Sequence, residues 1–478
     1  MIYRAAKGAM WDPSVFWHDG RYHAVMMHNP DGTNGLDATR GLIAVSDDGV
    51  HWQDGWEIMP ERELSSGTKF FKAFIARIGP RFILNHGVFR KDGRQNTLRF
   101  YESCDLRNWT YLFSSSPDAA WYNTDGRWDH MYALPKDEAD PAAGFWGYPV
   151  ATTKPGLPRA LGMTETLDGR AWKTLPPPEI EWGDTPQKDL EIGGCERIGG
   201  KYVIIGGEHN YLSGGYSMYT LVGDGPRGPF RPAPDTFRLC GTSSRACGWG
   251  VSFLAAWARG KDGELLISNY AAVPSGTWLL PLRKAVYADG HLRLGWWPKN
   301  DALKGEPIAS VAAALSLDAA PGERKLSWLA PAFDLERGML MEGSVCANAK
   351  GGNGAAGFAF MEPAGRTMEI RLGIGADGQQ ETHIGRYDEA SGFKSEDTTG
   401  QGCATVRGLC DGVEHRFRLL VRHDLFELYV DDLLMQTYTY RPAGGRVGLL
   451  TVGAKAVFDR LQASVLLLGP SAVRTSRR

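Results

Sequence analysis

The chain has 478 residues, a length that predicts two or three domains rather than a single core. Its 55 acidic and 53 basic residues leave a net charge of −2, which argues against nucleic acid or an anionic membrane as partner. Hydrophobic residues make up 43%, and 60 glycines and 16 tryptophans are spread along the sequence. Short aromatic-rich strands separated by glycine turns predict an all-β protein.

The first predicted strands lie within residues 11–23, where a carboxylate stands just before a short apolar strand. Asp12 precedes Pro13, which favours extended backbone at the residue before it. Asp19-Gly20 then predicts a tight turn into a second, aromatic-rich strand. A carboxylate at a strand start is an ordinary turn cap in many β-proteins, so this unit gains meaning only through repetition.

Two later segments place a carboxylate at the same point of a strand–turn–strand unit. Asp129 precedes an apolar strand, and Glu191 begins a strand that runs to a Gly-Gly turn. Asp125 and Glu196 are their rivals, although Asp125 belongs to an Asp-Gly turn and Glu196 lies nearer the Gly-Gly turn. Three acids at equivalent points of repeated units are expected to converge on one site.

The repeated units also share a turn in which Ser or Asp precedes a Trp. The clearest copies are residues 44–52, 101–109 and 164–172. A fourth, weaker copy ends at residues 223–230, and a fifth unit is expected within 253–298. Ser and Asp oxygens are expected to cap the turn amides while the Trp fills the gap between sheets. Spacings of roughly 55 to 60 residues predict four-stranded propeller blades.

The pattern changes after residue 300, and this change sets the predicted domains. Residues 1–300 are expected to form a five-bladed β-propeller, and the Ala-, Pro- and Gly-rich residues 301–324 a linker. Residues 325–468 show longer alternating strands, including a hairpin around His423-Asp424, and predict a β-sandwich. Residues 469–478 form a basic tail.

Targeting and cofactor signals are weak throughout the chain. Residues 1–7 hold no apolar segment of a secretory signal, and no apolar run reaches the ~20 residues of a membrane helix. Seven cysteines without paired spacing favour reduced thiols in a cytoplasmic protein. No metal or cofactor is predicted, and the sandwich is a candidate surface for homo-oligomer formation.

Paired acids indicate glycosidic bond cleavage, which needs one carboxyl group to protonate the leaving oxygen and another to attack or to activate water. Asp12, Asp129 and Glu191 are the catalytic candidates. A third acid can hold hydroxyl groups or tune its neighbours' pKa values. The side chains proposed to bind substrate beside these acids are Trp11, His86, Arg127, Glu208, His209 and Trp249.

Several segments in chain order carry a family resemblance: Asp12-Pro13 with residues 19–22, then 127–129, 191–201, 280–292 and the hairpin 426–431. Together they resemble the five-bladed-propeller glycoside hydrolases of families 32, 43, 62 and 68, and family 32 with its appended β-sandwich over nearly the whole chain. The resemblance implies an oligosaccharide substrate that contains a furanose.

The resemblance to family 32 implies a retaining enzyme with Asp12 as nucleophile, Asp129 as transition-state stabiliser and Glu191 as acid/base. Trp11 and Ser14 depart from the family 32 pattern Asn-Asp-Pro-Asn-Gly. The opening is closer to family 43, which implies inversion with Asp12 as general base, as in arabinofuranosidases or xylosidases. A glycosyl-transferring variant, a non-catalytic sugar-binding propeller and a β-rich interaction scaffold remain as alternatives.

Overall fold

The structure is a computed structural model that describes residues 1–58, 69–90, 93–185, 190–210, 215–233, 238–240, 251–309, 313–330, 332–374, 380–395, 409–440 and 442–473. For 208–210, 215–217, 238–240, 251–254, 380–381, 439 and 472–473 the description covers the backbone alone. Strands dominate the described chain, as the sequence predicts. None of its described helices is long and apolar enough to cross a membrane.

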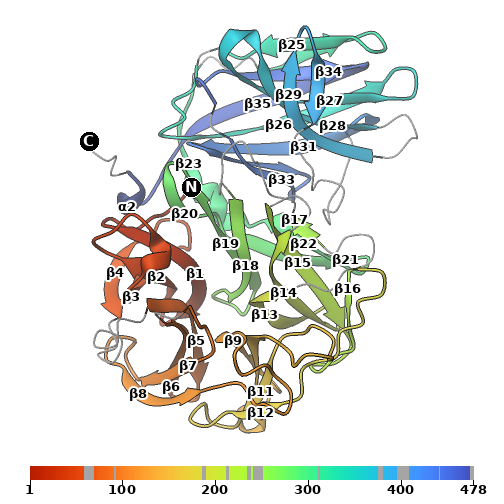
Figure 1. The fold of residues 1–478 in the computed structure, drawn as a ribbon. Helices are drawn as coiled ribbons and strands as arrows, with labels where there is room; N and C mark the ends of the chain where they lie inside the picture. The colour runs from red at the N-terminus through yellow and green to blue at the C-terminus, as the bar shows by residue number, and fades with distance from the viewer. Residues whose placement is uncertain are drawn as a thin grey trace.

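The first half consists of consecutive antiparallel sheets, each following the previous one along the chain (Figure 1). Their strands are β1 (Ala9–His18), β2 (Arg21–Asn29), β3 (Arg40–Ser46) and β4 (Gln53–Ile58); β5 (Lys69–Ile78), β6 (Arg81–Phe89), β7 (Leu98–Ser103) and β8 (Thr110–Ser115); β9 (Trp128–Pro135), β10 (Phe145–Ala151), β11 (Met163–Thr166) and β12 (Lys173–Leu175); and β13 (Leu190–Ile198), β14 (Lys201–Asn210), β15 (Gly215–Gly223) and β16 (Phe230–Pro232), with β17 (Arg238–Cys240) on β15.

A further group of strands completes this half and leads into the second. It comprises β18 (Val251–Arg259), β19 (Leu265–Val273), β20 (Gly276–Leu279), β21 (Arg283–Ala288) and β22 (His291–Trp296). The first strand of each sheet contacts the first strand of the next, in the order β1, β5, β9, β13 and β18, and β18 contacts β1 again. These contacts are consistent with the predicted propeller.

The predicted capped turns are present between strands. Asp48 Oδ1 accepts hydrogen bonds from the amides of Val50 and His51 at 2.8 Å each, and Trp52 donates its indole N–H to the Gly49 carbonyl at 3.0 Å. Trp52 is fully buried in the core of the first half. The same arrangement recurs at Asp105 with Trp109 and at Asp168 with Trp172.

The second half is a pair of antiparallel sheets around their own core, drawn in cyan to blue in Figure 1. One sheet holds β26 (Met339–Ala349), β31 (Asp411–Arg422), β32 (Leu425–Val430), β33 (Leu433–Thr439) and β35 (Ala454–Leu466). The other holds β25 (Arg324–Trp328), β27 (Gly354–Met361), β28 (Thr367–Ile374), β29 (Gln380–Asp388), β30 (Gly392–Ser395) and β34 (Val447–Val452). The predicted hairpin is β31–β32, with Arg422 opposite Leu425.

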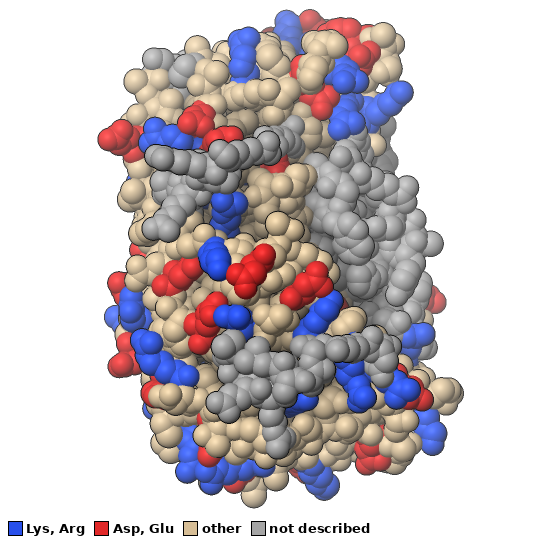
Figure 2. Space-filling view, turned by 60° about the vertical axis from the view of Figure 1, so that its left-hand side comes forward, with Lys and Arg blue, Asp and Glu red and all other residues tan. Residues whose placement is uncertain are grey.

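The segment predicted as a linker contributes strands of its own. β23 (Lys304–Pro307) and β24 (Leu315–Asp318) both pair with β35, and Gly295 of β22 pairs with Leu433 of β33. The short helical segments of the described chain are η1 (Gly35–Asp37), η2 (Pro141–Ala143), η4 (Pro298–Leu303), η5 (Pro363–Gly365) and α2 (Pro470–Val473). Acidic and basic side chains are interspersed over the face drawn in Figure 2, in keeping with the nearly neutral net charge.

Candidate active site

Each first strand of the five described groups in the first half contains a β-bulge or irregular register. The shifts lie between Trp11 and Ser14 in β1, Phe70 and Ala73 in β5, Asp129 and Met131 in β9, Ile192 and Gly194 in β13, and Phe253 and Ala256 in β18. A bulge leaves a residue outside the ladder and re-aims its side chain. The repeated bulges therefore mark where these adjoining strands present side chains to one another.

Asp12 lies in the bulge of β1, and its backbone corrects the sequence-based expectation. Pro13 predicts extended geometry at Asp12, whereas φ of Asp12 is 49°, a left-handed value that the bulge imposes. The side chain is buried and accepts a hydrogen bond from the Tyr270 hydroxyl at 2.7 Å. Burial raises the pKa of Asp12, while the charge of Lys72 and the Tyr270 hydrogen bond oppose that rise.

Asp129, on β9, is fully buried between two basic side chains. Arg127 donates from Nε to its Oδ2 at 2.8 Å, and Nδ1 of His130 lies 2.5 Å from its Oδ1. Burial pushes the pKa of Asp129 up, but Arg127 and His130 outweigh it and hold the pKa below the usual value. Asp129 therefore stays ionised at neutral pH although it is out of contact with water.

Glu191 begins β13 and shares Arg127 with Asp129. The Arg127 guanidinium donates from Nη1 to Glu191 Oε1 at 3.0 Å, and the Glu191 side chain is 19% exposed. The Tyr219 hydroxyl donates to the Glu191 carbonyl at 2.9 Å, and a Cβ on Gly206 would meet that carbonyl at 1.8 Å. Glycine at 206 thus allows the close backbone approach that places Glu191.

The rivals of these acids have other partners. Glu196 is buried and accepts from Arg259 Nε at 2.9 Å and from the Tyr132 hydroxyl at 2.5 Å. Asp125 lies in an exposed turn, 3.7 Å from Arg94. Neither contacts Arg127, so the shared guanidinium distinguishes Glu191 from Glu196.

Lys72 joins the three candidate acids and was missed by sequence reasoning, which searched the repeats for carboxylates. It lies in the bulge of β5, fully buried, and its charge interacts with Asp12, Glu191 and Asp129. Burial lowers the pKa of Lys72, and the three carboxylates oppose that shift. A signal was present in the sequence, since a lysine interrupts an apolar run at 69–75.

The predicted substrate-binding residues separate into three groups. Trp11 and Arg127 lie at the acids, with the Trp11 ring edge-on to Tyr270 at 5.4 Å between centroids. His86 is fully buried between the rings of Phe70 and Tyr101, and burial lowers its pKa to about 4, so the structure places it in the core rather than at the acids. The side chains of Glu208 and His209, and all of Trp249, lie outside the described residues.

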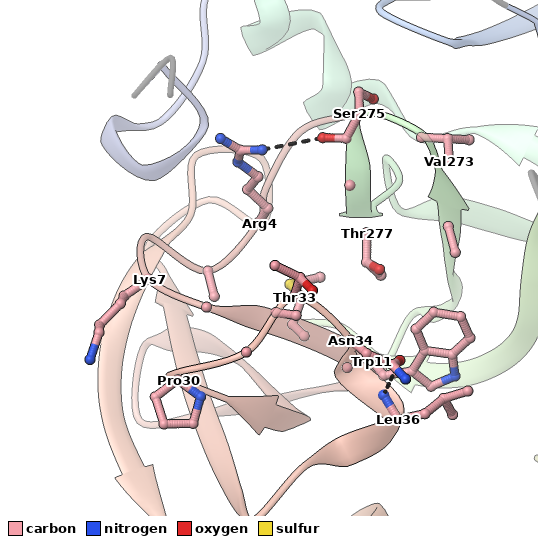
Figure 3. A pocket seen from close by; sticks show the side chains of 18 of the residues that line it. Arg4, Lys7, Trp11, Pro30, Thr33, Asn34, Leu36, Val273, Ser275 and Thr277 are labelled. Atoms are coloured by element: carbon pink, nitrogen blue, oxygen red, sulfur yellow. Dashed lines mark hydrogen bonds between the residues drawn. The ribbon is translucent and has the colours of Figure 1, made fainter. Parts of the chain in front are cut away.

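A cavity of about 1010 Å³ opens beside Trp11. The start of β1, the loop 30–36 and the turn 272–277 between β19 and β20 line it (Figure 3). Arg4 donates to the Ser275 carbonyl at 3.3 Å on one side, and Trp11 lies near Leu36 and Asn34 on the other. Trp11 therefore connects this cavity with the Tyr270–Asp12 pair.

Comparison with known proteins gives no match to any family profile or to any curated protein sequence. Solved structures do match. The chain has the fold of the family 32 glycoside hydrolases. A Bombyx mori GH32 beta-fructofuranosidase has a TM-score of 0.65 at 12% identity, with 97% of this chain and 93% of that chain covered.

Two further solved structures cover a similar extent. Sucrose-6-phosphate hydrolase from Lactobacillus gasseri has a TM-score of 0.64 at 14% identity, covering 96% of this chain and 93% of its own. Fructan 1-exohydrolase IIa from Cichorium intybus has a TM-score of 0.65 at 12% identity, covering 96% of both chains. At such identities the likeness establishes the fold, and activity has to be argued from the site.

Proposed function

We propose that this chain is a glycoside hydrolase that cleaves a furanose-containing oligosaccharide, built as a five-bladed β-propeller followed by a β-sandwich. One observation carries the proposal: Asp12, Asp129 and Glu191 come from three different strands, the charge of Lys72 acts on all three, and Arg127 pairs with Asp129 and Glu191. A turn cap needs no such convergence, because it serves only its own loop. Burial of two of the acids also fits catalysis rather than solvation.

In the proposed retaining reaction, the Asp12 carboxylate attacks the anomeric carbon while Glu191, as the acid, protonates the departing glycosidic oxygen. The bond to the leaving sugar breaks as the bond to Asp12 forms. Water then attacks the same carbon, gives its proton to the Glu191 carboxylate and releases Asp12. Glu191 suits proton exchange with water because it is the most exposed of the three acids.

Asp129 and Arg127 would serve the transition state rather than the covalent step. Asp129 is held ionised by Arg127 and His130, so its charge can stabilise positive charge that develops on the sugar ring. Arg127 retains 28% of its side-chain exposure and can donate to a substrate hydroxyl while it fixes both carboxylates. Its bidentate fork makes it suited to holding that geometry.

The cavity beside Trp11 is not lined by the acids themselves, but through Trp11 it adjoins the Tyr270–Asp12 pair and would offer room for further sugar units. Its volume of about 1010 Å³ is at the upper end of small-ligand pockets. A variant of the Bombyx enzyme has been solved with sucrose, and one of the Cichorium enzyme with 1-kestose. These two fructosides are therefore the first substrates to test on this chain.

The test uses purified protein with sucrose and 1-kestose, and with aryl arabinofuranosides and xylosides in parallel. Asp12→Asn and Glu191→Gln are each expected to lower turnover by roughly three orders of magnitude with little change in melting temperature. Asp125→Asn, in an exposed turn, is the matched control and should keep wild-type rates. Wild-type turnover in both site variants would overturn the assignment.

The stereochemistry of the first product separates the two mechanisms. NMR of the initial anomer is expected to show retention if Asp12 is the nucleophile, and inversion if Asp12 activates water as a general base. Inversion on an arabinofuranoside or xyloside would instead support the family 43-like alternative. New oligosaccharides at high substrate concentration would indicate glycosyl transfer.

A further inference from the structure

Lys72 lies in the bulge of β5 as Asp12 lies in the bulge of β1, and each bulge is in the first strand of its sheet. Its side chain is fully buried, and its Nζ has no hydrogen-bond partner among the described residues. The ammonium lies over the ring of Phe74, 5.1 Å from Nζ to the ring centroid. A buried ammonium without acceptors destabilises a fold, so a structural role does not explain this lysine.

The basic side chains of the site are divided unequally among the acids. Asp129 has both Arg127 and His130 in direct contact, and Glu191 has Arg127. The Asp12 side chain accepts its hydrogen bond from the neutral Tyr270 hydroxyl. Among the charged groups that act on Asp12 and favour its ionised form, Lys72 is the strongest.

We propose that Lys72 is a positioning residue that supplies the counter-charge for Asp12, so that this buried carboxylate is ionised and oriented when substrate arrives. The proposal rests on the proposed function for its catalytic meaning, but the pairing of the two groups can be measured without substrate. A carboxylate must be charged to attack a carbon or to take a proton from water. Burial alone would favour the protonated, unreactive form.

The charged and titratable groups that act on this pair are Asp129 and His130 on β9, Glu191 on β13 and Tyr270 on β19. Arg127, just before β9, pairs with Asp129 and Glu191. Glu191 opposes ionisation of Asp12, and His130 favours it more weakly than Lys72 does. Removal of Lys72 therefore leaves Asp12 without its strongest compensating charge.

The test compares Lys72→Met, which removes the charge at similar volume, with Lys72→Arg, which keeps it. Lys69→Met is the matched control, because Lys69 lies on the same strand but points to the surface, where it pairs with Asp37 at 2.5 Å. The carboxyl of Asp12 is titrated directly by 13C NMR of protein labelled at the aspartate carboxyl carbon. Its resonance is identified by its loss in Asp12→Asn.

In Lys72→Met the Asp12 carboxyl is expected to titrate at a pH higher by about one unit or more, the usual effect of losing an adjacent cation. Lys72→Arg and Lys69→Met should titrate as the wild type does. The acidic limb of the pH profile of kcat/KM on the fructoside should move by as much as the NMR midpoint of Asp12. At a pH below the new midpoint, kcat/KM should then fall about tenfold for each pH unit by which the midpoint has moved. Melting temperature should stay equal or rise in Lys72→Met, since no hydrogen bond is lost.

An unchanged Asp12 titration in a folded Lys72→Met protein would overturn the inference, as would a wild-type acidic limb. A moved NMR midpoint without cleavage of any tested glycoside would support the Lys72–Asp12 pairing and count against the proposed function. A lower melting temperature together with an unmoved midpoint would assign Lys72 to structure and reject the positioning role.

Discussion

Arg127→Met should destabilise the first half of the protein in a pH-dependent way. Arg127 makes ion pairs with Asp129 at 2.8 Å and with Glu191 at 3.0 Å, and Asp129 is fully buried. Removing one partner of a buried pair costs about 3–5 kcal/mol, because the other charge stays buried without compensation. Since Arg127 is 28% exposed and His130 still contacts Asp129, we expect a loss of about 2–3 kcal/mol at pH 7.5.

The sign of the pH dependence follows from the depressed pKa of Asp129. A carboxyl group whose pKa is lowered on folding contributes stability above its unfolded pKa, about 3.9, and that contribution is lost as the pH falls through the folded value. In Arg127→Met the folded pKa of Asp129 rises. The difference in stability between wild type and variant should therefore be largest at neutral pH and shrink toward pH 4.

Urea unfolding at pH 7.5, 6 and 4.5, followed by tryptophan fluorescence, gives the free energy of unfolding of the wild type and of the variant. The difference is taken from the transition in which the first half of the protein unfolds. Arg170→Met is the control, because Arg170 binds both oxygens of Glu102 at 3.0 Å on the exposed surface and should matter far less. A destabilisation that is the same at all three pH values would refute the electrostatic reasoning. So would an effect no larger than that of Arg170→Met.

Two further predictions concern packing and pH. Gly193→Ala should lower kcat/KM about 100-fold and reduce the melting temperature. The added Cβ would lie 1.7 Å from the Ala255 carbonyl oxygen, so β13 would have to move away from β18. Unchanged kinetics would contradict this account. Although burial opposes it, pairing with Asp431 and Asp411 raises the pKa of His415, so the sandwich should lose stability as pH rises from 6 to 8. Melting curves across this range should flatten in His415→Gln, and an equal slope in both proteins would refute the assignment.

The turns and the change in strand pattern could be predicted from the sequence, because both depend on residues that are close together in the chain. The Asp-capped turns at Asp48, Asp105 and Asp168 depend on residues two to four positions apart, and the structure contains all three. The change after residue 300 was also visible, because strand length and turn residues are local properties. The segment 301–324 was harder, since its strands β23 and β24 exist only through pairing with the distant β35.

The composition of the candidate site was decided by tertiary structure. The sequence offered Asp12, Asp129 and Glu191 as equivalents within repeated units, but it could not rank Glu191 against Glu196. That choice depends on which acid meets Arg127 and which meets Arg259, two arginines far apart in the chain. His86 looked equally polar in the sequence, yet stacking between two rings puts it in the core.

The sequence by itself determined the strand-and-turn repeats and the positions of the acids, because both follow from the chemistry of neighbouring residues. Tertiary structure alone decided the electrostatics of the site. Bulges in separate strands place Lys72 where its charge acts on Asp12, and they turn Asp12 to a φ of 49°, against the extended geometry that Pro13 favours. A pKa depends on burial and on charges that are near in space, and the sequence of a single strand determines neither of them.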